Sequence, residues 1–230
     1  MYKKSLFSAL VCLVAFPAFA HANSFTFTDP GVAKAVITTN DGGSIEVDLT
    51  SLITNPISDA SEVSGIIITL GSNPGTDSGF SSETGTLINI SSTGVVSAAG
   101  GSITHWGTSV FSNGDVCLET VKPGSGPGCA AAHQPTDMII GDNTAYTNAN
   151  SSITGKDPQI QGTGVFIINL SGVTSSTNVT GVSFETGTSG DDFSSVIDPD
   201  PPSVPEPSSL ALLGTGLAGM AEMVRRRMRS

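Results

Sequence analysis

The chain has 230 residues, 20 of them acidic and nine basic, and a formal net charge of −11. Six of the nine basic residues lie at the two ends, so the segment 23–203 holds three lysines against 18 acids, a formal charge of −15. A segment this acidic repels nucleic acid and anionic lipid, which argues against nucleic-acid binding. About 180 residues are enough for one well-filled core.

Residues 1–22 predict a secretory signal peptide. Lys3 and Lys4 precede an apolar run over residues 6–16, and Ala18-Phe19-Ala20 has the small-residue pattern of a cleavage site. A second site would cut after Ala22. We therefore expect an exported protein.

Residues 23–190 predict an all-β domain. Short runs of alternating apolar and polar residues are separated by turn sequences such as Asp41-Gly42-Gly43, Asn73-Pro74-Gly75 and Asn113-Gly114-Asp115. This pattern favours a single antiparallel β-sandwich or jelly-roll-like domain. The expected strands are 24–28, 33–39, 44–49, 63–70, 86–90, 102–106, 109–111, 116–121, 138–140, 164–170 and 179–185.

Two of these runs, 65–70 and 165–170, are apolar on both faces and are expected to be central strands. The polar segments 71–85 and 141–163 are expected to be loops. Residues 191–203 are rich in aspartate and proline, which predicts a semi-rigid linker.

Cys117 and Cys129 are the cysteines that remain after signal cleavage, and they bracket a loop rich in proline and glycine. In an oxidising compartment this arrangement predicts a disulfide. The alternative is a metal site, but the pair lacks the close C-x-x-C spacing of zinc ligands.

The sequence contains no G-x-S-x-G, H-E-x-x-H or P-loop motif, so no catalytic residue is expected. Trp106 is a candidate glycan contact; its alternative role is a core aromatic. Ca²⁺ could bind at Asp137 and Asp142 or at Asp191-Asp192, although none has a complete calcium-loop motif. No other cofactor or metal is expected.

The C-terminal segment 204–230 has three parts. Val204, Pro205, Glu206 and Pro207 form a short motif in which the prolines favour an extended, accessible backbone. The apolar run 210–224 would make a helix of about 22 Å, shorter than the roughly 30 Å core of a bilayer. A basic cluster follows and favours a cytoplasmic C-terminus; it consists of Arg225, Arg226, Arg227 and Arg229.

This tripartite tail resembles the PEP-CTERM sorting signal of Gram-negative bacteria. The resemblance implies a precursor that is anchored transiently in the inner membrane by a transmembrane sorting helix. An exosortase, its expected partner, then processes the tail, and the protein reaches the cell surface or the extracellular space. Because this system accompanies exopolysaccharide and biofilm production, the resemblance also implies a matrix role and exopolysaccharide as a possible partner.

Three functions remain open at this point. The first is a non-enzymatic surface or matrix protein, and the second is a secreted glycan- or Ca-binding module with the same localisation. The third is a secreted hydrolase. A simple membrane anchor with a chance proline motif is the alternative to the sorting signal.

Overall fold

The computed structural model describes residues 22–121, 129, 136–155, 158–188, 193–196 and 198–199. The predicted sorting tail, residues 1–21 of the predicted signal peptide and Asp191-Asp192 lie outside these residues. Within the described part of the chain, no helix has the length and apolar character needed to cross a membrane.

The described chain is built of twelve strands and one short 3-10 helix, η1 (Asp59–Ser61). The strands are β1 (Asn23–Asp29), β2 (Ala33–Asn40), β3 (Ser44–Ser51), β4 (Val63–Leu70), β5 (Asp77–Ile90), β6 (Val96–Ala98), β7 (Gly107–Val110), β8 (Val116–Glu119), β9 (Ile139–Ile140), β10 (Gln159–Leu170), β11 (Val179–Thr186) and β12 (Phe193–Val196).

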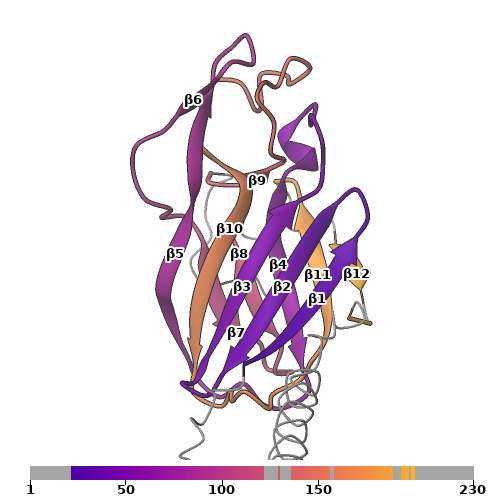
Figure 1. Cartoon of the computed structure of the whole chain (residues 1–230), viewed down its shortest axis with the longest axis vertical. Helices are drawn as coiled ribbons and strands as arrows, with labels where there is room; N and C mark the ends of the chain where they lie inside the picture. Colours follow the sequence, from indigo (N-terminus) through magenta and orange to yellow (C-terminus); the bar gives the residue numbers. More distant parts are fainter. Residues whose placement is uncertain are drawn as a thin grey trace, which may run out of the picture.

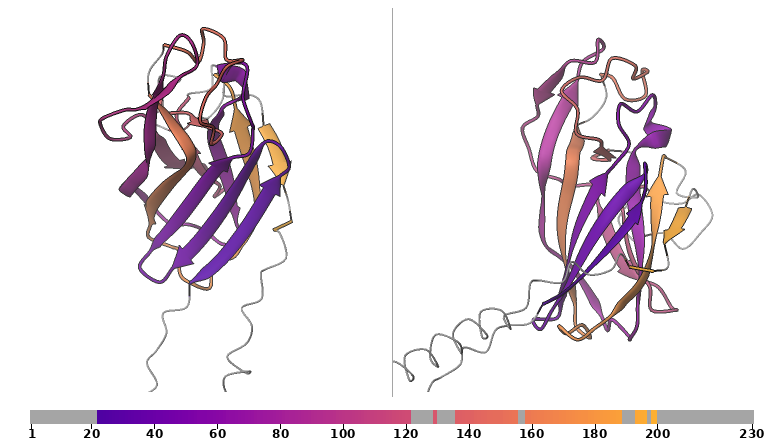
Figure 2. Two further views of the ribbon diagram at one scale, coloured as in Figure 1. Left: turned by 45° about the horizontal axis from the view of Figure 1, so that its top comes forward. Right: turned by 45° about the vertical axis from the view of Figure 1, so that its right-hand side comes forward.

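The strands form two facing runs. In one run β1, β2, β3, β10 and β5 pair in that order, and in the other β12, β11, β4, β8 and β7 pair. Figure 1 shows the first run in front of the second, and Figure 2 shows both layers from other sides. Strand β9 links the runs because it pairs with β10 and with β4.

The core lies between the two layers. Strands β2 and β3 alternate strictly between buried and half-buried residues, as expected for strands with one face on a core. Large buried side chains from both runs meet there, including Phe27, Phe166 and Phe184. A smaller, separate cluster of buried side chains surrounds Tyr146; it contains Ile88, Ile90, Ile140 and Ile153.

The predicted all-β fold is confirmed, but the sheet is not wholly antiparallel. Strands β9 and β10 pair in parallel through Ile139 and Ile160. The parallel contact is short and joins the two layers, so it could not be anticipated from the alternation of single strands.

Four other expectations need correction. Strand β5 begins at Asp77 and β10 at Gln159, although both segments were expected to be loops. Residues 102–106 are not a strand, whereas residues 193–196, expected in the linker, form β12. In each case cross-strand pairing, which a local pattern does not reveal, decides the outcome.

Candidate functional site

A polar groove runs along β7, where this strand faces the connection from β4 to β5. Two adjoining cavities of about 490 and 310 Å³ make up the groove, and Val110 lines both. Strands β5 and β7 lie in contact here without pairing. We call this feature the β7 groove; its walls are residues 70–73, 75–77 and Gly79 on one side and residues 108–114 on the other.

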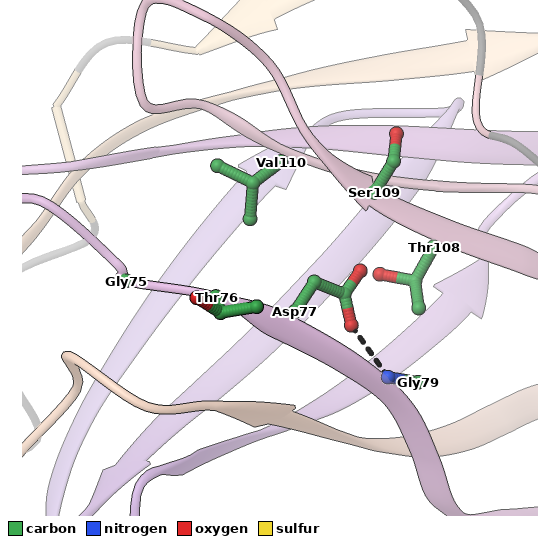
Figure 3. Close-up of a pocket in the computed structure, with 7 residues that line it drawn as sticks. All are labelled: Gly75, Thr76, Asp77, Gly79, Thr108, Ser109 and Val110. Atoms are coloured by element: carbon green, nitrogen blue, oxygen red, sulfur yellow. Dashed lines mark hydrogen bonds between the residues drawn. The ribbon is translucent and has the colours of Figure 1, made fainter.

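Side-chain turns hold the first wall of the groove in place. The carboxamide oxygen of Asn73 accepts a hydrogen bond from the Gly75 amide at 2.8 Å. Asp77 Oδ1 accepts one from the Gly79 amide at 2.7 Å, as Figure 3 shows. Gly75 has φ +78°, and a Cβ there would lie 2.5 Å from the backbone nitrogen of Gly172, so the turn needs glycine.

The opposite wall is the turn between β7 and β8. Asn113 Oδ1 accepts a hydrogen bond from the Asp115 amide at 3.1 Å, and its amide group donates to the Asp115 carboxylate at 2.7 Å. The Phe111 amide donates to the Asp115 carbonyl at 2.8 Å. The turn at Asn73 and the turn at Asn113 are therefore each held by their own hydrogen bonds.

Three side-chain oxygens of residues that line the 490 Å³ cavity have no hydrogen-bond partner among the described residues. They are buried side-chain atoms: Asp77 Oδ2, Thr108 Oγ1 and Ser109 Oγ. Figure 3 shows the Asp77 carboxylate of β5 and the Thr108 hydroxyl of β7 turned toward one another, while the Ser109 hydroxyl points away from them. A buried oxygen without a partner costs about 1–3 kcal/mol, so these atoms weaken the closed contact between β5 and β7.

Among the described residues, the lining of the β7 groove carries no lysine, arginine or histidine. Its polar groups are hydroxyls, carboxamides and one carboxylate, and its apolar surface comes from Val110, Phe111 and Leu70. Such a surface can exchange hydrogen bonds in both directions, but it has no cation to hold an anionic ligand.

The expectation of a glycan contact at Trp106 needs correction. Trp106 is only 3 % exposed, and its ring lies 4.6 Å from that of Phe166 between centroids. Its indole N–H donates to the carbonyl of Asp137 at 2.9 Å. Trp106 is a core aromatic with no open face for a sugar.

A histidine–aspartate pair lies beside Trp106. His105 Nδ1 and Asp137 Oδ2 are 3.0 Å apart, and the same oxygen accepts a hydrogen bond from the Thr104 amide at 3.1 Å. Burial, and then the charge of Asp137, raise the pKa of the nearby Glu83. These bonds join the residues before β7 to those before β9.

Cys117 and Cys129 form a disulfide, as predicted. The carboxylate of the buried Glu119 accepts a hydrogen bond from the Cys129 amide at 3.3 Å. Burial raises the pKa of Glu119 to about 7, although this hydrogen bond lowers it. Because the disulfide occupies both sulfurs, Glu119 is the one side chain of these three that could still bind a metal ion.

A calcium site at Asp137 and Asp142, completed by backbone carbonyls, stays a prediction. Among the described residues, the group of three possible metal-ligating side chains is Cys117, Glu119 and Cys129, which includes neither aspartate. Asp142 is exposed, and Asp137 Oδ2 is already engaged by Thr104 and His105.

Sequence reasoning located the turns of the β7 groove but not the groove. Asn73-Pro74-Gly75 and Asn113-Gly114-Asp115 are visible as turn sequences. Asp77 and Thr108 carry no local signal, because they come together only when β5 and β7 face each other.

Comparison with known families matches one part of the chain. Residues 203–229 fit the family model described as the PEP-CTERM protein-sorting motif. No curated protein and no solved structure matches the chain significantly. The motif indicates an exported protein that transits the membrane and whose C-terminus is processed by an exosortase.

Proposed function

The chain is a PEP-CTERM domain-containing protein, and we propose that it is a non-enzymatic component of the cell surface or extracellular matrix. Its β-sandwich, jelly-roll-like domain is the displayed cargo. Its tail anchors the precursor in the inner membrane until an exosortase removes it, and the mature protein works together with exopolysaccharide in a biofilm.

The observation that carries this proposal is the sorting motif at residues 203–229, which follows an acidic all-β domain. Strand β12 ends at Val196, so the β domain and the motif are close in sequence. The Cys117–Cys129 disulfide agrees with an oxidising destination.

The test of sorting is the intact mass of the exported protein from a host with and without its exosortase gene. We expect a C-terminus near residues 204–208 in the first strain and the full arginine tail in the second. Added mass on the new C-terminus would indicate covalent attachment, and its absence release. A full-length C-terminus in both strains would overturn the proposal.

The matrix role has its own test. Deleting the gene should change the polysaccharide or protein content of the isolated matrix, and the full chain should restore it. A chain with Pro205→Ala and Pro207→Ala should fail to restore it. Unchanged matrix after deletion would contradict this part of the proposal.

A second candidate function is a glycan-binding module with the same localisation. One observation favours it, the β7 groove with its hydroxyls, carboxamides and unpaired oxygens.

A further inference from the structure

We propose that the β7 groove binds a neutral polyhydroxylated ligand, a segment of saccharide. This inference deepens the second candidate function. It relies on the proposed export only for the compartment in which the protein encounters its ligand. The binding itself belongs to the described β domain.

The chemistry of the lining selects the ligand class. An anionic ligand would meet the Asp77 carboxylate, with no basic residue among the described residues of the lining and a strongly acidic domain around it. A divalent cation would find one carboxylate, fewer charged ligands than calcium sites use. A sugar offers hydroxyls that donate to Asp77 or Asn73 and accept from Thr108 or Ser112.

The unpaired oxygens supply the second argument. Asp77 Oδ2 and Thr108 Oγ1 face each other, are closed off from solvent, and have no hydrogen-bond partner among the described residues. A ligand hydroxyl can therefore reach them only if β5 and β7, which do not pair here, move apart. It would then donate to the carboxylate and accept from the threonine. The ligand would then remove two buried unsatisfied groups at once.

The dimensions and rigidity of the groove fit this ligand. The two cavities, of about 490 and 310 Å³, have the size of small-molecule sites and share Val110, so a chain of sugar rings could pass from one to the other. Phe111 gives the 310 Å³ cavity an apolar surface against which sugar C–H groups can pack. The Asn73 and Asn113 turns hold the walls, which lowers the ordering cost of binding.

The test uses the exported protein purified from its host, with maltoheptaose, cellohexaose and dextran as neutral probes and alginate as an anionic one. Calorimetry or ligand-observed NMR should detect at least one neutral probe and no alginate. Binding of alginate alone, or of none of the four, would overturn the proposal. Because purified protein is used, the result does not depend on how the tail is processed.

Thr108→Val separates binding from folding. The side chain keeps its shape and loses an unpaired hydroxyl, so stability should stay equal or increase. Affinity should fall about ten-fold, which corresponds to about 1.4 kcal/mol. Asp77→Asn, which keeps an acceptor for the Gly79 amide, should act in the same direction.

The matched control is Thr38→Val on β2, outside the groove, which should leave affinity unchanged. Equal affinity of the wild type and both groove variants would show that binding occurs elsewhere, and it would overturn the assignment of the groove.

Discussion

Glu62 is a buried carboxylic acid whose oxygens have no hydrogen-bond partner among the described residues. Burial, and then the charge of Asp59, raise its pKa from 4.5 to about 8. In the unfolded chain Glu62 ionises near pH 4.5, so the folded state keeps it protonated at a cost that grows with pH. The contribution of Glu62 to the free energy of unfolding is therefore highest below pH 4.5 and is lost as pH rises toward 8.

We predict that Glu62→Gln raises the free energy of unfolding at pH 8 by about 4 kcal/mol and leaves it nearly unchanged at pH 4. The amide keeps the shape of the protonated acid and cannot ionise. Urea unfolding at both pH values measures the difference. Glu46→Gln, on the half-buried face of β3, is the control, and a Glu62→Gln effect that is equal at both pH values would contradict the assignment.

Gly65 occupies a position where no side chain fits. It pairs with Glu119 on one neighbouring strand and with Glu185 on the other. A Cβ at Gly65 would lie 2.5 Å from Glu185 Oε2 and 2.6 Å from Glu119 Cγ. The missing side chain makes room for two buried glutamates on one face of the sheet.

Gly65→Ala should therefore destabilise the protein by about 1–3 kcal/mol, through overpacking against both glutamates. Chemical denaturation reports the change. Gly42→Ala is the matched control, because a Cβ at Gly42 would meet no atom within 4 Å. If the two variants were equally stable, the glutamates would have room to move aside.

At the scale of single elements, the disulfide connects Cys117, the second residue of β8, to Cys129, 12 residues along the chain. Both cysteines are fully buried, so the bond fixes a return of the chain against this layer of strands. A closed loop of this size stabilises mainly by limiting the unfolded chain.

The variant with both Cys117→Ala and Cys129→Ala should lose about 2–4 kcal/mol of unfolding free energy. Wild-type protein in reductant should lose a similar amount, and reductant should leave the double variant unchanged. A 2 Da mass gain on reduction confirms the bond in the exported protein. Equal stability of all forms would show that the bond contributes nothing.

The elements differ in how well sequence predicts them. Strands β2 and β3 were predicted because each has one face on the core and alternates residue by residue. The first half of β5 was missed because Ser, Thr, Gly and Glu dominate it, and only pairing with β10 makes it a strand. The sorting motif needed no structure, whereas Trp106 needed one, since sequence cannot distinguish a buried aromatic from an exposed one.

At the scale of the whole molecule, negative charge dominates. The segment 23–203 has 18 acids and three lysines. Charges of one sign repel across a folded domain, and dissolved salt screens this repulsion over about 10 Å at 0.1 M.

We therefore expect the melting temperature to rise by about 2–5 °C when NaCl is increased from 20 to 500 mM. Differential scanning calorimetry at pH 7.5 measures it, with uncharged sucrose as a control for general solvent effects. A melting temperature that falls with salt would mean that attractive ion pairs outweigh the repulsion.

Strand β12 also sets how far the processed end can travel from the domain. Its last residue, Val196, precedes Val204 by eight residues, which reach at most about 28 Å when fully extended. An enzyme that cuts there works within about one domain diameter of the β12 edge. After the cut, anything joined to the new end stays within that distance of the β12 edge, so the domain cannot extend further from its point of attachment.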